Sequence, residues 1–184
     1  MERIIHDKKK YSKRRDSWDL NLGFYCDIRH YDKDGNLLYE ELGSHNMITN
    51  EGLQKIWDVF FRGATAPTGF YMELYTNSSG LSKDSVLSDF TEPSGNGYAA
   101  VSISRDSTGW PTLQAVNGQM RITSKECTFQ ASGGSWPTVY GAYIRDASGT
   151  YAVCWDGFAV ARTLQDQDTL KVTLYIEREN PTAE

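Results

Sequence analysis

Hydrophobic and polar side chains alternate along the early part of the chain, which is the pattern of a β-strand buried on one face. The alternating apolar residues are Leu20, Leu22, Phe24, Cys26 and Ile28. The sequence Asp-Lys-Asp-Gly-Asn at 32–36 follows and predicts a hairpin turn, with a returning strand near 37–42. The Asp-x-Asp-x-Asn spacing also resembles a calcium loop, but Leu37 and Gly43 stand where such a loop needs Gly and Glu, so we favour the turn.

The second half of the chain contains short strand patterns separated by turn signals. We expect strands at 70–75, 98–104, 120–123, 125–130, 138–145, 150–155 and 169–176. In the last of these, Leu170, Val172, Leu174 and Ile176 lie on one face and polar residues on the other. One face of the sheet is therefore buried and its other face is in water.

A single helix is predicted between the first hairpin and the later strands. Thr49 or Asn50 can cap it and Gly63 ends it. Its apolar positions, at helical spacing, are Leu53, Ile56, Trp57, Phe60 and Phe61. We expect this stripe to pack against the sheet and to bury Trp57, in preference to forming a ligand box.

These elements predict a mainly β protein: a β-sandwich of the jelly-roll or immunoglobulin-like kind, with one amphipathic helix and an extended N-terminal arm. We expect residues 1–17 to form the arm and residues 18–184 a single domain. Residues 76–97 form a long polar excursion, for which Val86, Leu87 and Phe90 are the expected anchors.

Composition supports a globular protein without metal or disulfide staples. The 184 residues are 39% hydrophobic and 23% charged, enough to build a core. Three cysteines without a C-x-x-C pair are expected to be reduced and buried. No apolar run reaches membrane-spanning length, and the N-terminus is charged where a signal peptide would be hydrophobic, which predicts a protein neither membrane-spanning nor secreted by the common route.

The net charge of −5 is divided unevenly along the chain. Residues 1–15 carry a charge of +5, so the remainder carries −10. The basic residues expected to bind a partner are Lys8, Lys9, Lys10, Lys13, Arg14 and Arg15. With little apolar content the arm cannot fold by itself, and we expect it to lie on an acidic protein surface; nucleic acid is the less favoured partner, because an acidic body repels a duplex.

Candidate catalytic residues are few. The chain has no Walker loop, G-x-S-x-G elbow or H-E-x-x-H motif, so we expect no cofactor, no metal and no enzyme activity. The three histidines, His6, His30 and His45, are interpreted as structural or solvated. A glycan-cleaving enzyme is a third hypothesis. The carboxylates that it could use include Glu40, Glu41, Asp156, Asp166 and Asp168.

Three tryptophans raise a second possibility of function. Trp110 and Trp136 each precede a proline, and Trp155 lies at the end of a predicted strand. Exposed rings in such loops could stack on sugars, although rings that cap the sandwich core are the preferred interpretation.

The order of several segments resembles a family of small structural proteins of tailed bacteriophages. The similar segments are Asn46–Leu53, Phe70–Asn77, Ser85–Glu92 and Gly97–Ala99, followed by Cys127–Phe129, Thr138–Gly141, Tyr151–Trp155 and Gln167–Thr173. The resemblance covers about residues 45–176 and rests on turn and strand signatures. It implies a virion component of the tail, neck or capsid exterior.

We therefore expect a non-enzymatic structural protein of a phage virion, made in the host cytoplasm and assembled in multiple copies with itself and other virion proteins. The alternative is a carbohydrate-binding or receptor-binding module of a tail fibre or spike. Glycan-array binding would favour that alternative, whereas many copies in purified particles without glycan affinity would favour the structural role.

Overall fold

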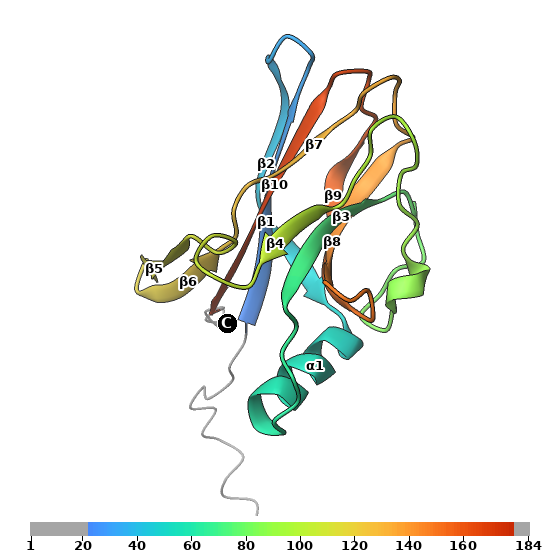
Figure 1. The fold of residues 1–184 in the computed structure, drawn as a ribbon. Coiled ribbons are helices and arrows are strands. Elements are labelled where there is room, and N and C mark those ends of the chain that lie inside the picture. Colours follow the sequence, from blue (N-terminus) through green and yellow to red (C-terminus); the bar gives the residue numbers. More distant parts are fainter. Residues whose placement is uncertain (1–21, 179–184) are drawn as a thin grey trace, which may run out of the picture.

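The computed structural model describes residues 22–178, which form ten antiparallel strands and one α-helix (Figure 1). The elements are β1 (Leu22–Tyr31), β2 (Leu37–Ile48), α1 (Asn50–Phe61), β3 (Gly69–Tyr75), β4 (Val101–Ser104), β5 (Thr112–Val116), β6 (Gln119–Thr123), β7 (Cys127–Gln130), β8 (Val139–Asp146), β9 (Ala152–Arg162) and β10 (Thr169–Arg178). A 3-10 turn, η2, spans Leu87–Asp89.

The strands follow the order β4-β3-β8-β9-β2-β1-β10-β6-β5, with β7 paired to β10. The sheet curls so that β1 and β10 form one layer and β3, β8 and β9 form the other (Figure 1). β2 belongs to both, since it pairs with β1 along most of its length and with β9 at Met47 and Ile48. The predicted mainly β sandwich with one helix is confirmed, with β2 as the strand common to both layers.

A bulge in β2 accompanies this change of partner. Its register against β1 shifts between Cys26 and Ile28, and Gly43 adopts a φ of +67°. The Gly43 N–H donates to Asp27 Oδ1 at 2.9 Å. Bulges bend a strand and increase its twist, which explains how β2 leaves one layer and enters the other.

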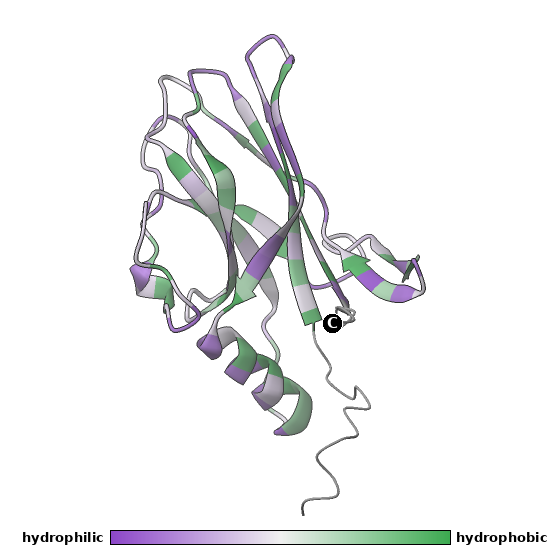
Figure 2. Ribbon diagram, turned by 180° about the vertical axis from the view of Figure 1, so that it is seen from behind, coloured by the Kyte–Doolittle hydropathy of each residue, from purple (hydrophilic) through white to green (hydrophobic). Residues whose placement is uncertain are grey.

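The core lies between the two layers. On β1, Phe24, Cys26 and Ile28 are buried, as the alternation predicted, and Leu170, Val172 and Leu174 of β10 join them. Figure 2 shows the corresponding alternation of apolar and polar residues along the strands. Cys26, Cys127 and Cys154 are free and buried, as expected.

Two sequence-based details need correction. The strand β5 was not predicted, because its side chains are half-buried or exposed on both faces and leave no alternation to detect. In the 76–97 excursion, Phe90 is buried and Leu87 packs beside it, but Val86 is 43% exposed and is not an anchor. The Asn117-Gly118 turn that joins β5 to β6 has both φ values positive, as an Asn-Gly hairpin requires.

The 32–36 turn is confirmed. Asp32 Oδ1 accepts hydrogen bonds from the backbone N–H groups of Asp34 and Asn36 at 2.9 and 2.8 Å. Asp32 Oδ2 accepts a third from Asn36 Nδ2. The acidic residue therefore stabilises the turn through its own backbone neighbours.

Candidate interaction surface

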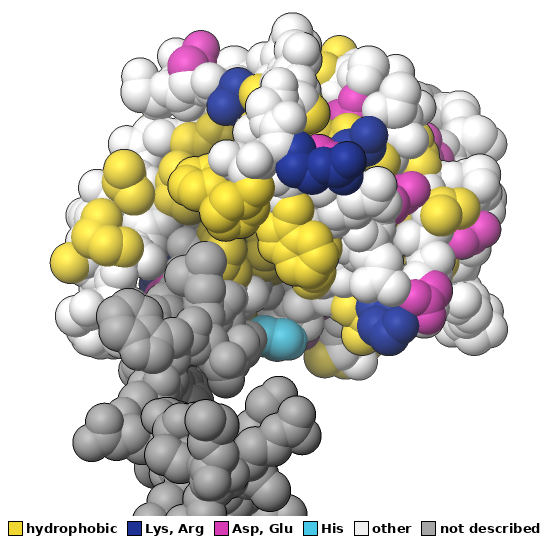
Figure 3. Space-filling view, turned by 90° about the horizontal axis from the view of Figure 1, so that it is seen from below, with side chains coloured by type: hydrophobic (Ala, Val, Ile, Leu, Met, Phe, Trp, Pro, Cys, Tyr) yellow, Lys and Arg dark blue, Asp and Glu magenta, His cyan; other side chains and the backbone are white. Residues whose placement is uncertain are grey.

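Large apolar side chains are exposed at the end of the sandwich where β1 begins and α1 projects. We call this the end surface; it comprises Leu22, Trp57, Phe60, Phe61 and Leu113, each more than 40% exposed. Figure 3 views this end and shows hydrophobic side chains gathered on it. Large apolar side chains that gather on one face of a protein are typical of a site of contact with another molecule.

The first turn of α1 is held closely against the body of the protein. Thr49 caps it, accepting a hydrogen bond from the Gly52 N–H at 3.0 Å and donating to the Ala152 carbonyl at 2.6 Å. A Cβ added at Gly52 would lie 2.3 Å from the Val153 carbonyl oxygen, so the two backbones touch. Beyond this anchor, the helix extends away from the layers (Figure 1).

The prediction that Trp57 is buried is therefore wrong. Trp57 is 53% exposed, and Phe60 and Phe61 are 78% and 74% exposed. Of the apolar stripe, Ile56 packs against the core as a partly buried side chain. Helical spacing correctly identified the stripe but could not reveal that Trp57, Phe60 and Phe61 remain exposed while Ile56 packs against the core.

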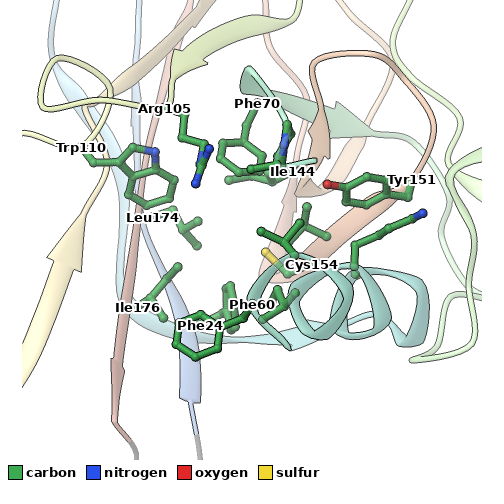
Figure 4. A pocket seen from close by; sticks show the side chains of 17 residues that line it. Phe24, Phe60, Phe70, Arg105, Trp110, Ile144, Tyr151, Cys154, Leu174 and Ile176 are labelled. Atoms are coloured by element: carbon green, nitrogen blue, oxygen red, sulfur yellow. The ribbon is translucent and has the colours of Figure 1, made fainter. Parts of the chain in front are cut away.

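Between α1 and the two layers lies an apolar pocket of about 260 Å³. Phe24 and Leu174 come from one layer, and Phe70, Ile144 and Cys154 from the other (Figure 4). Ile56, Val59 and Phe60 form its helical wall. The pocket is thus a gap at the end surface that is enclosed by both layers and by α1.

Two basic side chains border this pocket. Lys55 of α1 lies with Nζ 5.8 Å from the centre of the Tyr151 ring, and Arg105 follows β4. Within residues 22–178, neither has an ion-pair partner. An apolar cavity with two unpaired cations favours an apolar group accompanied by negative charge.

The predicted partner-binding residues Lys8, Lys9, Lys10, Lys13, Arg14 and Arg15 lie outside the described residues, as does His6. Their role in binding stays a prediction.

His30 is buried in a polar network with Arg162 of β9 and with Asp168, which precedes β10. Its Nε2 lies 3.2 Å from Asp168 Oδ2, and its Nδ1 accepts from Arg162 Nε at 3.2 Å. Burial lowers the pKa of His30, which keeps the imidazole neutral at pH 7. With only 1% of the residue exposed, the ring is inaccessible to a substrate, and the network joins β1, β9 and the residue that precedes β10.

The other candidate histidine and carboxylates make structural contacts. His45 has an edge contact with the Tyr25 ring, and Glu40 pairs with Arg29 at 2.8 Å. Glu41 accepts from the Ala159 N–H, and Asp166 accepts from the N–H groups of Gly133 and Gly134.

Asp156 is a buried carboxyl that sequence patterns did not distinguish from the others. Its Oδ1 accepts from Ser44 Oγ at 2.9 Å, whereas its Oδ2 has no hydrogen-bond partner among the described residues. The β2–β9 register places Asn46 opposite it, and Asn46 Oδ1 is likewise buried without a partner. Burial raises the pKa of Asp156 to about 7.

A second buried carboxylate, Glu73 of β3, is compensated by its neighbours. Arg145 Nε donates to it at 2.6 Å, and the Tyr143 hydroxyl donates to its other oxygen. Glu92, from the 76–97 excursion, accepts from the same hydroxyl at 3.3 Å. The cluster ties the excursion to the outer face of the second layer.

The three candidate tryptophans are engaged with the body of the protein. Trp136 is 2% exposed and its Nε1 donates to the Asn96 carbonyl at 2.9 Å. Trp155 Nε1 donates to the Ser82 carbonyl, and Trp110 is half-buried with an edge contact to Phe70. The preferred interpretation, in which the rings cap the core, is confirmed for Trp136.

Residues 22–178 contain no cluster of three potential metal-ligating side chains. Their helix is too short and too polar to cross a membrane.

A β-sandwich whose buried polar networks around His30 and Glu73 join its strands, and which exposes apolar side chains at one end, has the character of a structural protein that makes contacts. Comparison with known families identifies the family: residues 47–175 match the one described as "Podophage GP4 fiber I protein gp80". The match covers more than half of the chain, so the chain belongs to this family of bacteriophage virion structural proteins. The resemblance expected over residues 45–176 is confirmed. No curated protein matches the chain.

Proposed function

We propose that this chain is a non-enzymatic fibre component of a phage virion that assembles in multiple copies and uses its end surface to contact its neighbours. The observation that carries the proposal is the exposure of Trp57 and Phe61 on the side of α1 away from the pocket. Two aromatic side chains in water cost free energy that a contact surface recovers on binding, and aromatic residues are enriched at interface centres.

The polar clusters support a role without catalysis. His30 is enclosed between Asp168 and Arg162, and Glu73 is neutralised by Arg145. Each cluster joins strands or loops of the sandwich, a function that needs no substrate. The family match supports a location in the virion and association with other virion proteins.

The basic arm offers a second contact. Lys8, Lys9, Lys10, Lys13, Arg14 and Arg15 carry the charge that would complement an acidic neighbouring protein. We keep the arm as a proposed fastening element, with charge reversal of these six residues expected to prevent incorporation into the particle.

The receptor-binding alternative receives no support from the tryptophans that suggested it. Trp136 is buried, and Trp155 donates its indole N–H to the body. Fibre assembly therefore remains the proposed function, and a glycan array tests the alternative directly.

The assembly proposal is tested by a double substitution, Trp57→Glu with Phe61→Glu, introduced into the phage. We expect loss of the chain from purified particles, because two buried charges would oppose the contact, while the isolated variant unfolds at nearly the wild-type temperature. The matched control is Leu37→Glu with Leu38→Glu, two leucines each 51% exposed at the start of β2. Normal incorporation of the Trp57/Phe61 variant would contradict the proposal.

A further inference from the structure

The apolar pocket beside α1 has a candidate occupant in the chain itself. We propose that residues 16–20, with the sequence Asp-Ser-Trp-Asp-Leu, dock into the pocket of their own subunit and insert the Trp18 ring. These residues lie outside the described part of the chain. The contact is within one subunit, so it goes beyond the proposed assembly function and does not depend on it.

The place where β1 begins brings this segment close to the pocket. The described chain starts at Leu22 on the end surface, and Phe24, two residues later, lines the pocket. Four residues can span up to roughly 13 Å, which is enough for Trp18 to return to the cavity. The short tether also gives the segment an effective concentration on the order of millimolar at the pocket. A molecule free in solution at a lower concentration would therefore compete poorly with it.

The pocket suits an aromatic ring in size and chemistry. An apolar cavity of roughly 150 Å³ admits benzene in another protein, so the 260 Å³ here admits the larger indole. Its walls include Phe70, Ile144 and Leu174, whose carbon surfaces would gain contact with the ring. Filling it would remove apolar surface from water on both partners.

Charge selects residues 16–20 over the rest of the N-terminal segment. Lys55 and Arg105 border the pocket from two different elements and have no ion-pair partner among the described residues. Asp16 and Asp19 flank Trp18 and supply two negative charges. The remaining apolar residues before β1 belong to the basic arm, which Lys55 and Arg105 would repel. They are Met1, Ile4, Ile5 and Tyr11.

Docking of residues 16–20 has a consequence for the arm. Residues 1–15 would then leave the subunit at the end surface, beside the outward side of α1 that carries Trp57 and Phe61. The basic arm and the aromatic contact surface would meet the same neighbour.

The first test asks whether the pocket is filled in the full-length chain, using free indole as the probe. Indole should raise the melting temperature of Trp18→Ala by several degrees, because the vacated pocket binds it, and should leave wild type unchanged. Tyr11→Ala is the matched control and should behave as wild type. Adding Val59→Trp to Trp18→Ala, to fill the cavity from α1, should abolish the response. If wild type and Trp18→Ala respond equally, or neither responds, the proposal is wrong.

The second test examines the role of the charges, and whether the segment in the pocket comes from the same subunit or from a neighbouring copy. Asp19→Lys should make the chain responsive to indole, and adding Lys55→Glu should restore the wild-type lack of response by recreating an opposite-charge pair. Wild type should remain unresponsive over a hundredfold dilution while sedimenting as the same species. A response that appears on dilution together with dissociation would assign the segment to a neighbouring copy and would overturn docking within one subunit.

Discussion

At the scale of single residues, the buried pair Asn46 and Asp156 is the least satisfied polar feature among the described residues. Each contributes one buried oxygen without a hydrogen-bond partner there, and the strand register sets them opposite each other. A carboxylate that is buried with one oxygen unpaired is disfavoured relative to its neutral form. Burial accordingly raises the pKa of Asp156 to about 7.

The pair predicts a pH dependence of stability. Because the folded-state pKa of Asp156 is about 7, above the unfolded value, the folded protein gains stability from this group at low pH. That gain is complete below about pH 4 and is lost as the pH rises through about 7. Asp156→Asn is neutral at every pH and carries a donor, so its stability relative to wild type should increase by about 2–3 kcal/mol between pH 5 and pH 8.

Urea unfolding of both proteins at the two pH values measures this difference, since other titrating groups cancel between them. A constant difference across the range would contradict the assigned pKa. Nothing in the sequence identified this pair, because the two residues lie on strands far apart in the chain and meet only through the β2–β9 pairing.

At the scale of elements, the ends of α1 are determined by local sequence, whereas its direction is determined by packing. The cap at Thr49 and the positive φ of Gly63 were predictable, because both are local requirements of a helix end. The direction of the helix depends on Gly52 meeting the Val153 backbone, a contact between distant residues. Apolar spacing alone therefore predicted a buried Trp57 where the structure has an exposed one.

Gly52→Ala tests that contact. In an exposed helix this change gains about 1 kcal/mol of helix propensity. Here the added Cβ would meet the Val153 carbonyl oxygen at 2.3 Å, so we expect a loss of about 1–3 kcal/mol in urea unfolding. Gln54→Ala, at an exposed position of the same helix, is the control and should change little. A stabilised Gly52→Ala would show that α1 does not rest on β9.

Two tryptophan truncations test the exposed and buried assignments together. Trp136→Ala should cost about 3–5 kcal/mol, since the ring is buried and its N–H is hydrogen-bonded. Trp57→Ala should cost less than about 1 kcal/mol, because half of the side chain is already in water. Chemical denaturation of the isolated variants measures both, and equal losses would place Trp57 in the core.

At the scale of the whole molecule, the strand alternation determined the fold class but not the topology. The inward residues of β1 and β10 were predictable because one face of each strand is buried, so apolar and polar side chains alternate along it. The dual pairing of β2 was not, since it depends on a bulge at Gly43 and on a partner far along the chain. The pocket and the end surface follow from this long-range arrangement. Sequence alone therefore predicted a partner-binding arm but neither of these two features.

The division into an arm of residues 1–17 and a domain from residue 18 stays a prediction. Deleting residues 1–17 should leave the cooperative unfolding transition nearly unchanged, because the core residues of the described strands begin at Phe24. Thermal and urea unfolding of the truncated chain measure this. Loss of the transition would place part of the arm in the core.

The central claim is that the end surface contacts other proteins of the virion. Cryo-EM of the intact phage tests it most directly, by locating every copy of the chain and the neighbours of α1. We predict that Trp57 and Phe61 are covered by another chain, or by a second copy of this one, in the assembled particle. A map in which the end surface of every copy faces solvent would contradict the account.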